Sequence, residues 1–549
     1  MTKHISFSVT PVQHNAVLDE AHIGDIYGAF GSISANDQSS SLSRWQKLKM
    51  LLTIIGPGLI VMVGDNDAGA FGTYTQAGQN YGTALLWTLL LLIPVLYVNQ
   101  EMVLRLGAVT GVGHARLIFA RFGKFWGMFS VVDLFILNAL TIVTEFIGIS
   151  LGLDYLGVSK IWGLLAAAII IMVAATTGSF RRFERFAMLL VLGSLLLVPV
   201  VLMVHPPLSQ IGHDLITPAM PAHSKLSEVM LIIIAIVGTT IAPWQLFFQQ
   251  SYIIDKRITP RYIKYARIDL WLGIVIVIVG AVAMMAFCAQ TFGGRPEFGN
   301  FVDAGAVAHG IQKYCGHLPG ILFAIALIDA SIIGACAVSL ATAYALGDVM
   351  SIKHSLHRKA SDAKGFYAVF CGLIAIAAAL VVTPHMPLGL LTNLVQTLAG
   401  VLLPSATVFL LLLCNDKAVL GPWVNSKLIN TFSGAVVAAL VMLSIILTAS
   451  VLFPAINETQ ILTILGTGVV VTLLSALLVK GYEHLRGVPS VTKITYGQGV
   501  RDTWRMAPLS ELPPAKISLL SRLWMIVLRG YLILAAGMLI FKMIALAIG

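Results

Sequence analysis

The chain has 549 residues, of which 58% are hydrophobic and 11% are charged, and its mean hydropathy is +0.89. Soluble globular proteins carry about 25% charged residues, so this composition excludes a soluble domain and predicts a polytopic membrane protein. The net charge of +10 is typical of basic loops beside anionic headgroups, which we favour over nucleic-acid binding. The five scattered cysteines lack metal-ligand spacing and predict neither a disulfide framework nor a zinc site.

Residues 1–43 are polar, lack the apolar core of a cleavable signal peptide, and are predicted to form a disordered cytosolic tail. Thirteen apolar segments follow that are long enough to cross a hydrocarbon core of about 30 Å. Their approximate spans are 50–77, 82–106, 126–153, 161–178, 186–204, 227–254, 268–291, 318–347, 365–383, 390–414, 431–453, 460–480 and 523–548.

Loop charge orients these segments. If the N-terminus is cytosolic, strict alternation leaves few of the 35 Lys and Arg residues outside, namely Lys160, Lys225, Arg295 and Lys313. The basic runs "RRFER" (181–185), "DKRITPRYIKYAR" (255–267) and "KHSLHRKASDAK" (353–364) all fall inside. This bias follows the positive-inside rule. We therefore expect a multi-pass protein of the plasma (inner) membrane, in contact with the lipid bilayer and not with nucleic acid.

Two segments carry helix-breaking residues near the middle of the membrane. In the first, "GPG" (56–58) is followed by "GDNDAGAFG" (64–72), and the sixth contains "AIVGTTIAPWQLFFQQS" (235–251). Glycine loosens a helix and proline removes a donor, so both runs predict unwinding. Unwound backbone inside a membrane must line a cavity enclosed by protein. The alternative is two incidental kinks.

The positions of the two breaks predict the architecture. Segments 1 and 6 correspond if the core at 44–414 consists of two five-helix halves, about 44–204 and 225–414. An odd number of helices per half reverses the orientation, which gives the 5+5 inverted repeat of secondary transporters with a binding site at the paired breaks. Accessory helices 11 and 12 (415–480), a cytosolic linker (481–521) and a C-terminal membrane segment (522–549) would lie outside this all-α core.

The first break contains two acids, Asp65 and Asp67, while Lys and Arg are absent from segment 1 beyond Lys49 and from segment 6. A buried carboxylate is costly unless it is neutralised, so a transported cation or a bound proton is the natural partner. Carboxylates together with unwound backbone carbonyls suit magnesium, manganese or calcium.

The segment 1 stretch "GPGLIVMVGDNDAGAFGTYTQAGQ" resembles the first helix of the NRAMP family of divalent metal transporters, which reads GPG, eight residues, DPGN and a downstream QAG. Eight residues also separate Gly58 from Asp67 here, and QAG falls at 76–78. Three further stretches resemble other helices of the family and follow one another in the family's order. They are "TEFIGISLGL" for the third helix, "VGTTIAPWQLFFQQS" for the sixth and "NLVQTLAGVLLPSATVFLLLLCNDKAVLGPWVN" for the tenth.

This resemblance covers about residues 45–430. It implies a LeuT-like fold with helices 1 and 6 unwound around the ion, and proton-linked import of manganese, iron or related ions by alternating access. By family position, Asp67 is the metal-binding aspartate, Gln396 approaches the metal, and the carbonyl of Thr239 faces it. The cation is cargo, so no cofactor is expected.

The departures from the family pattern concern the ligands. DPGN becomes Asp67 to Ala70, so the asparagine amide is missing at Ala70, and MPHN becomes Ala242 to Gln245, so the methionine thioether is missing at Ala242. Losing a soft sulfur ligand relaxes discrimination against hard ions, and a less crowded pocket suits partly hydrated magnesium. We expect Mg²⁺ or Mn²⁺ in preference to Fe²⁺, as in the family's magnesium-transporting branch.

Proton coupling is left open by the sequence. The family histidine is replaced by Trp244, beside Gln245, and the third-helix acid Glu145 is retained. Histidine is the side chain best suited to proton exchange near neutral pH, whereas a buried Glu145 can titrate through desolvation. We name Glu145, Trp244 and Gln245 as candidates for proton exchange or gating. Asp65, Asp133 and Asp329 are further candidate acids, and each could instead be a hydrogen-bonded structural group.

Two other functional classes use polytopic membrane proteins. A sodium-coupled amino-acid symporter would use the same broken-helix fold, but its half-helix N-termini should be free of competing acids, and Asp65 and Asp67 argue against it. An integral membrane enzyme is not expected, because the sequence shows no nucleophile–base pair, nucleotide loop or HExxH-type motif.

Overall fold

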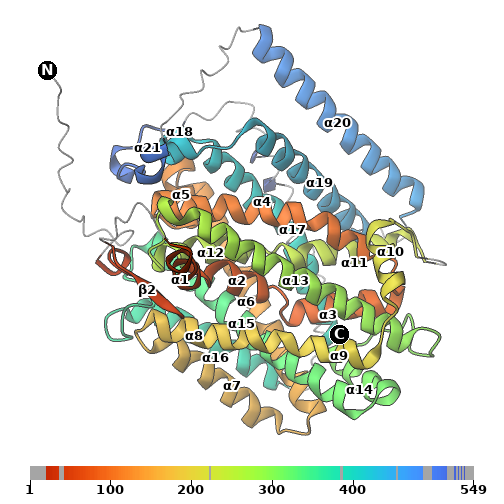
Figure 1. The fold of residues 1–549 in the computed structure, drawn as a ribbon. Coiled ribbons are helices and arrows are strands. Elements are labelled where there is room, and N and C mark those ends of the chain that lie inside the picture. Colours follow the sequence, from red (N-terminus) through yellow and green to blue (C-terminus); the bar gives the residue numbers. More distant parts are fainter. Residues whose placement is uncertain are drawn as a thin grey trace, which may run out of the picture.

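The computed structural model describes residues 20–35, 43–221, 224–383, 388–452, 456–485 and 498–515, with isolated positions between 525 and 537. Within these ranges the chain is a bundle of apolar helices (Figure 1). Nine of the described helices are long and apolar enough to cross a membrane, or ten if the bent pair α1–α2 counts as one span. The chain is therefore an integral, multi-pass membrane protein.

The α-helices of the first half are α1 (Arg44–Ile54), α2 (Pro57–Val63), α3 (Ala68–Tyr81), α4 (Leu86–Thr110), α5 (His114–Phe122), α6 (Lys124–Tyr155), α7 (Lys160–Thr176), α8 (Phe180–Gly193), α9 (Leu197–Val204) and α10 (Leu208–Ile216). Those of the second half are α11 (Leu226–Thr240), α12 (Pro243–Asp255), α13 (Ile263–Phe292), α14 (Ala304–Cys315), α15 (His317–Met350), α16 (Lys364–Val382) and α17 (Leu388–Asn415). They are followed by α18 (Lys417–Leu420), α19 (Lys427–Leu452), α20 (Glu458–Leu485) and α21 (Gln498–Thr503). The 3₁₀ turns are η1 (Glu20–His22), η2 (Ser194–Leu196), η3 (Pro260–Tyr262), η4 (Gly421–Trp423) and η5 (Leu509–Glu511), and the strands are β1 (Ile26–Gly28) and β2 (Gly31–Ile33).

The first twelve predicted segments each coincide with one helix or with consecutive helices separated by short interruptions. Two of them, α7 and the apolar part of α20, are shorter apolar helices. In Figure 1, α20 lies at the margin of the bundle beside α19. The thirteenth predicted segment, 523–548, lies outside the described residues apart from isolated positions.

Both predicted interruptions are present. The first separates α2, which ends at Val63, from α3, which begins at Ala68, and the second separates α11, which ends at Thr240, from α12, which begins at Pro243. An additional bend of 47° separates α1 from α2. It occurs at Gly56, whose φ of 150° is a conformation that favours glycine.

The prediction of a disordered tail over 1–43 is wrong for residues 20–35. Here β1 and β2 form an antiparallel hairpin in which Ile26 pairs with Ile33, and both side chains are buried. The basic run on α8 holds the hairpin, because Arg185 Nε donates to Ala29 O at 3.0 Å and Arg181 donates to Gly31 O at 3.0 Å. Residues 1–19 and 36–42 lie outside the described part of the chain.

Small residues let α13 approach the two halves of the first broken helix. A Cβ added at Gly58 would lie 2.7 Å from the Leu270 backbone, and one added at Gly78 would lie 2.3 Å from Met285 O. Close approach of two helix backbones at glycines is typical of helix pairs in membranes, where packing rather than the hydrophobic effect drives association. The broken helix is therefore fixed against α13 on both sides of its interruption.

A buried ionic cluster anchors the start of α2. Lys256 Nζ donates to Glu184 Oε1 at 2.7 Å and to the carbonyls of Ile54 and Ile55 at 2.9 and 2.8 Å. Beside it, Asp269 accepts from the amides of Gly56, Gly58 and Leu59 at 3.0, 2.6 and 3.3 Å. The side chains of Lys256 and Glu184 are fully buried.

Asp269 does not pair with Arg267, although Arg267 lies only two residues earlier on α13. Residues two apart on a helix do not face each other, so Asp269 points to the start of α2 while Arg267 pairs with Glu101 at 2.5 Å.

Lys256→Met should lower the free energy of unfolding by about 3–5 kcal/mol, because Glu184 would keep a buried charge without its partner. The double variant Glu184→Gln/Lys256→Met should recover part of this loss. Thermal unfolding of the purified protein in detergent measures both. Lys225→Met is the control, since Lys225 and its partner Glu228 are 80% and 56% exposed and should contribute little. A double variant less stable than Lys256→Met would contradict the role of the ion pair.

Candidate cation-binding site

Asp67 lies at the first interruption as the N-cap of α3. Its Oδ1 accepts from the Ala70 amide at 2.9 Å, and its backbone carbonyl accepts from Phe71 N at 2.9 Å. Aspartate is a favoured N-cap because its side chain satisfies an amide that the helix leaves unpaired. The side chain is 5% exposed, so the break holds a buried carboxyl at the positive end of a helix dipole.

Glu145, in the middle of α6, reaches the same helix end. Its Oε2 accepts from the Ala68 amide at 3.1 Å. A Cβ at Gly334 of α15 would lie 2.7 Å from Glu145 Oε2 and 2.9 Å from Asp67 Cβ, so both acids pack on one glycine. Glu145 Oε1 is buried without a hydrogen-bond partner among the described residues.

Gln396 of α17 is the third polar side chain beside the first turn of α3, together with Asp67 and Glu145. Its Oε1 accepts from Thr239 Oγ1 at 2.8 Å, and a Cβ at Gly69 would lie 1.5 Å from its Nε2. The amide therefore rests on the first turn of α3, next to Asp67. Because Pro243 has no N–H, the Thr239 carbonyl has no helical partner four residues on, which leaves it available to a ligand.

Ala70 and Ala242 flank this group without contributing polar side-chain atoms. Ala70 is fully buried and supplies only its amide, to Asp67. Ala242 is 6% exposed and its carbonyl accepts from Gln245 N at 3.2 Å. The available donors are thus carboxylate, amide and carbonyl oxygens, which suit hard cations. Within the described ranges, no three His, Cys, Asp or Glu side chains form a cluster that could hold a metal.

Asp65 belongs to a neighbouring polar chain. Its Oδ1 accepts from Gln245 Nε2, and Gln245 Oε1 accepts from Gln100 Nε2 at 2.8 Å. The other oxygen, Oδ2, is buried without a partner in the part of the chain that the structure describes. Gln245 thereby links the two interruptions.

Trp244 packs across the end of α2. The side chain is 1% exposed, and its Cη2 would lie 3.6 Å from a Cβ at Gly64. An indole does not titrate near neutral pH, so this position can act in packing or gating but cannot exchange protons.

Two contacts at the breaks were not expected from the sequence. The Tyr74 hydroxyl and Thr240 Oγ1 are 2.7 Å apart, which ties α3 to α11, and Asn66 Nδ2 donates to Val277 O at 3.1 Å. Tyr74 lies two helical turns beyond Asp67 and therefore on the same face of α3. This spacing is the sequence feature from which its position near the break could have been predicted.

The other candidate acids lie apart from this group. Asp133 lines a small cavity with Pro243 and Phe247, and Asp329 lines a separate cavity beside α9 and α13.

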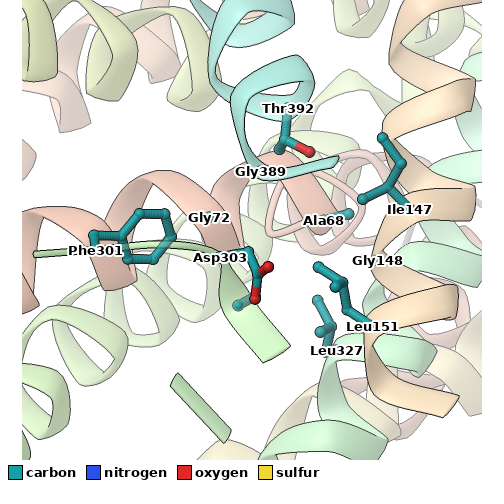
Figure 2. Close-up of a pocket in the computed structure, with 11 residues that line it drawn as sticks. Ala68, Gly72, Ile147, Gly148, Leu151, Phe301, Asp303, Leu327, Gly389 and Thr392 are labelled. Carbon is teal, nitrogen blue, oxygen red and sulfur yellow. The ribbon is translucent and has the colours of Figure 1, made fainter. Parts of the chain in front are cut away.

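A small cavity lies between Ala68 and the loop that precedes α14 (Figure 2). Its volume of about 10 Å³ is that of about one water molecule. Asp303, which accepts from Ala306 N at 2.8 Å as the N-cap of α14, is the charged residue of its described lining. The cavity is narrow because α6 and α3 approach closely here: a Cβ added at Gly148 would lie 2.5 Å from the Cβ of Ala68. The group around Asp67 is therefore nearly closed toward the loop before α14.

Comparison with known proteins gives a consistent result. Residues 58–450 match the family model described as natural resistance-associated macrophage protein-like (Nramp). The fold is similar to that of the Eremococcus coleocola manganese transporter in complex with an aromatic bis-isothiourea substituted compound, with a TM-score of 0.60, 18% identity, and coverage of 83% of this chain and 99% of that one. Two crystal structures of mutants of the same transporter give TM-scores of 0.62 at 18% identity, covering 84% and 82% of this chain and 98% of theirs.

Gly69→Ala should weaken binding of Mn²⁺ by about 10- to 100-fold, because the added methyl group displaces the Gln396 amide. Calorimetric titration of the purified protein measures the change. Gly434→Ala in α19 is the matched control, since a Cβ there meets nothing within 4 Å. Unchanged affinity in Gly69→Ala would remove Gln396 from the ligand set.

Proposed function

Because the chain belongs to the Nramp family of divalent metal transporters, we propose that it imports Mg²⁺ or Mn²⁺ across the plasma membrane by alternating access, with its N-terminus in the cytosol. It is a transporter and not an enzyme. We include Fe²⁺ as a further, less favoured cargo.

The convergence of buried oxygen ligands at the two breaks supports this proposal most directly. Asp67, Gln396 and the unpaired Thr239 carbonyl come from three helices, and Glu145 packs on the same glycine, Gly334, as Asp67. No ion pair links these two acids to a basic side chain within the described ranges. A divalent cation would supply the missing charge.

The same geometry argues against a sodium-coupled amino-acid symporter. In such a protein the substrate carboxylate would meet a free half-helix N-terminus. The first amides of α3 are already bonded to Glu145 and Asp67, and a third carboxylate would be repelled.

The preference for hard ions rests on Ala242 and Ala70. A thioether at position 242 would favour softer metals, and its absence leaves room for water on the ion, which Mg²⁺ releases reluctantly. Mn²⁺ accepts the same oxygen ligands.

Glu145 is the group that we assign to proton exchange. Glu145 Oε2 and the Asp67 side chain pack on the same glycine, Gly334, and two carboxylates this close repel each other, which favours a proton on one of them. Arrival of a divalent cation at Asp67 would favour its release.

Reconstitution of the full chain into liposomes tests the assignment of Asp67. Asp67→Ala should reduce Mg²⁺ and Mn²⁺ uptake to the level of protein-free liposomes, because the site loses its charged ligand. Asp154→Ala, which removes an exposed acid of α6, is the control. Internal pH recorded in parallel reports proton movement. Unchanged metal uptake in Asp67→Ala would overturn the assignment, and sodium-driven uptake of an amino-acid mixture without metal flux would favour the symporter.

Ala242→Met should shift the Mn²⁺ to Mg²⁺ uptake ratio upward by about tenfold, the effect of about 1.4 kcal/mol of differential binding. Competition uptake with both ions measures this ratio. Ala242→Leu has a similar side-chain volume without sulfur and should not produce the shift. Equal ratios in the two variants would show that the thioether is not the determinant at this position.

A further inference from the structure

We propose that a second, membrane-level cavity beside the first helix break binds lipophilic primary amines, with the ammonium group held by Asp329. The cavity, here called the Asp329 cavity, has a volume of about 420 Å³. This lies within the range of about 300–1,000 Å³ found for small-molecule sites. Its walls come from η2 and α9, α13, α15 and the break between α2 and α3.

The Asp329 cavity opens toward lipid. Its lining includes Leu202, Val275 and Val279, which are 65%, 55% and 56% exposed. All three lie on helices long and apolar enough to span a membrane, so a ligand dissolved in the bilayer can enter sideways.

Asp329 is the one charged side chain in the described lining of this cavity. Its Oδ2 is buried and has no hydrogen-bond partner among the described residues. The carboxyl fills the notch left by Gly193, where a Cβ would lie 2.3 Å from its Cγ. An acid in this setting is costly without a cationic partner.

An organic cation fits this site better than a metal ion. A divalent metal needs about six oxygen ligands and gives up its water reluctantly, whereas the lining is largely aliphatic. A primary ammonium group can donate a charge-assisted hydrogen bond to Asp329 Oδ2, and an alkyl chain of about 8–12 carbons would fill the apolar remainder.

The depth of Asp329 favours a lipophilic amine over a phospholipid headgroup. Asp329 lies twelve residues after His317, the first residue of α15, or about 18 Å along the helix axis. A headgroup remains at the interface, whereas a single-chain amine can place its nitrogen near mid-span.

A second polar atom in the wall links the cavity to the break. Asn66 lines it, and Asn66 Oδ1 is buried without a partner in the described structure. Val63 and Phe71, on either side of the interruption, also contribute to the lining. A ligand here would therefore contact the break and restrain its movement. This inhibitory consequence rests on the proposed transport function, but binding itself does not.

Photolabelling of the full chain in lipid nanodiscs tests the proposal. The probe is dodecylamine carrying a diazirine in its chain, and the comparator is the alcohol of the same length with the same diazirine. The amine should label α9 and α13 at least about tenfold more than the alcohol, and unlabelled dodecylamine should compete. Equal labelling by amine and alcohol would overturn the proposal.

Two variants separate the charge from the space. Asp329→Asn should lose the preference for amine over alcohol, and Val279→Trp should lose labelling by filling the cavity while the carboxyl remains. Asp133→Asn, which changes an acid of a different cavity, should label as the wild type does. Thermal unfolding shows whether each variant is folded. If Asp329→Asn does not fold, the loss of labelling in Val279→Trp is the result that tests the proposal. Amine-selective labelling that survives in the folded variant would contradict the site.

A flux measurement then addresses the consequence for transport. Dodecylamine should inhibit metal uptake by wild-type liposomes and should inhibit the Asp329→Asn protein at least about tenfold less. If metal uptake is absent altogether, the proposed function fails while the labelling result stands by itself.

Discussion

The first amides of α3 emerge inside the membrane, where no bulk water can satisfy them. Asp67 and Glu145 supply the acceptors, at 2.9 and 3.1 Å. This capping satisfies the unwound backbone, as the bilayer requires, and it also brings two acids together without a fixed countercharge in the described structure. The need to terminate a helix in mid-membrane and the capacity to bind a cation thus have the same structural origin.

The break can persist because its flanks are held elsewhere. Lys256, which is paired with Glu184, and Asp269 bind the backbone at the bend before α2, and glycines bring α13 against both α2 and α3. At the second break, Gln245 and Thr239 connect to the first break and to α17. Unwound segments clamped between fixed helices are the arrangement that lets a transporter move one part against another around a bound ion.

The sequence predicts those features whose causes are local. The glycines and acids at 64–72 and the Gly238 to Pro243 stretch weaken a helix locally, so both interruptions could be placed, and the position of Asp67 at the first break marked it as the candidate ligand. The hairpin at 20–35 could not be predicted, because its stabilising partners lie on α8, about 155 residues away. The partner of Asp269 and the contact of Asn66 with α13 likewise depend on packing that no local pattern encodes.

Crystals of the full chain soaked in Mn²⁺ provide the most direct test of the central claim, since anomalous diffraction at the manganese edge locates the ion independently of any activity. We predict a single strong peak between Asp67 and Gln396, within reach of the Thr239 carbonyl, that weakens when excess Mg²⁺ is added. A peak elsewhere, with none at the two breaks, would contradict the account.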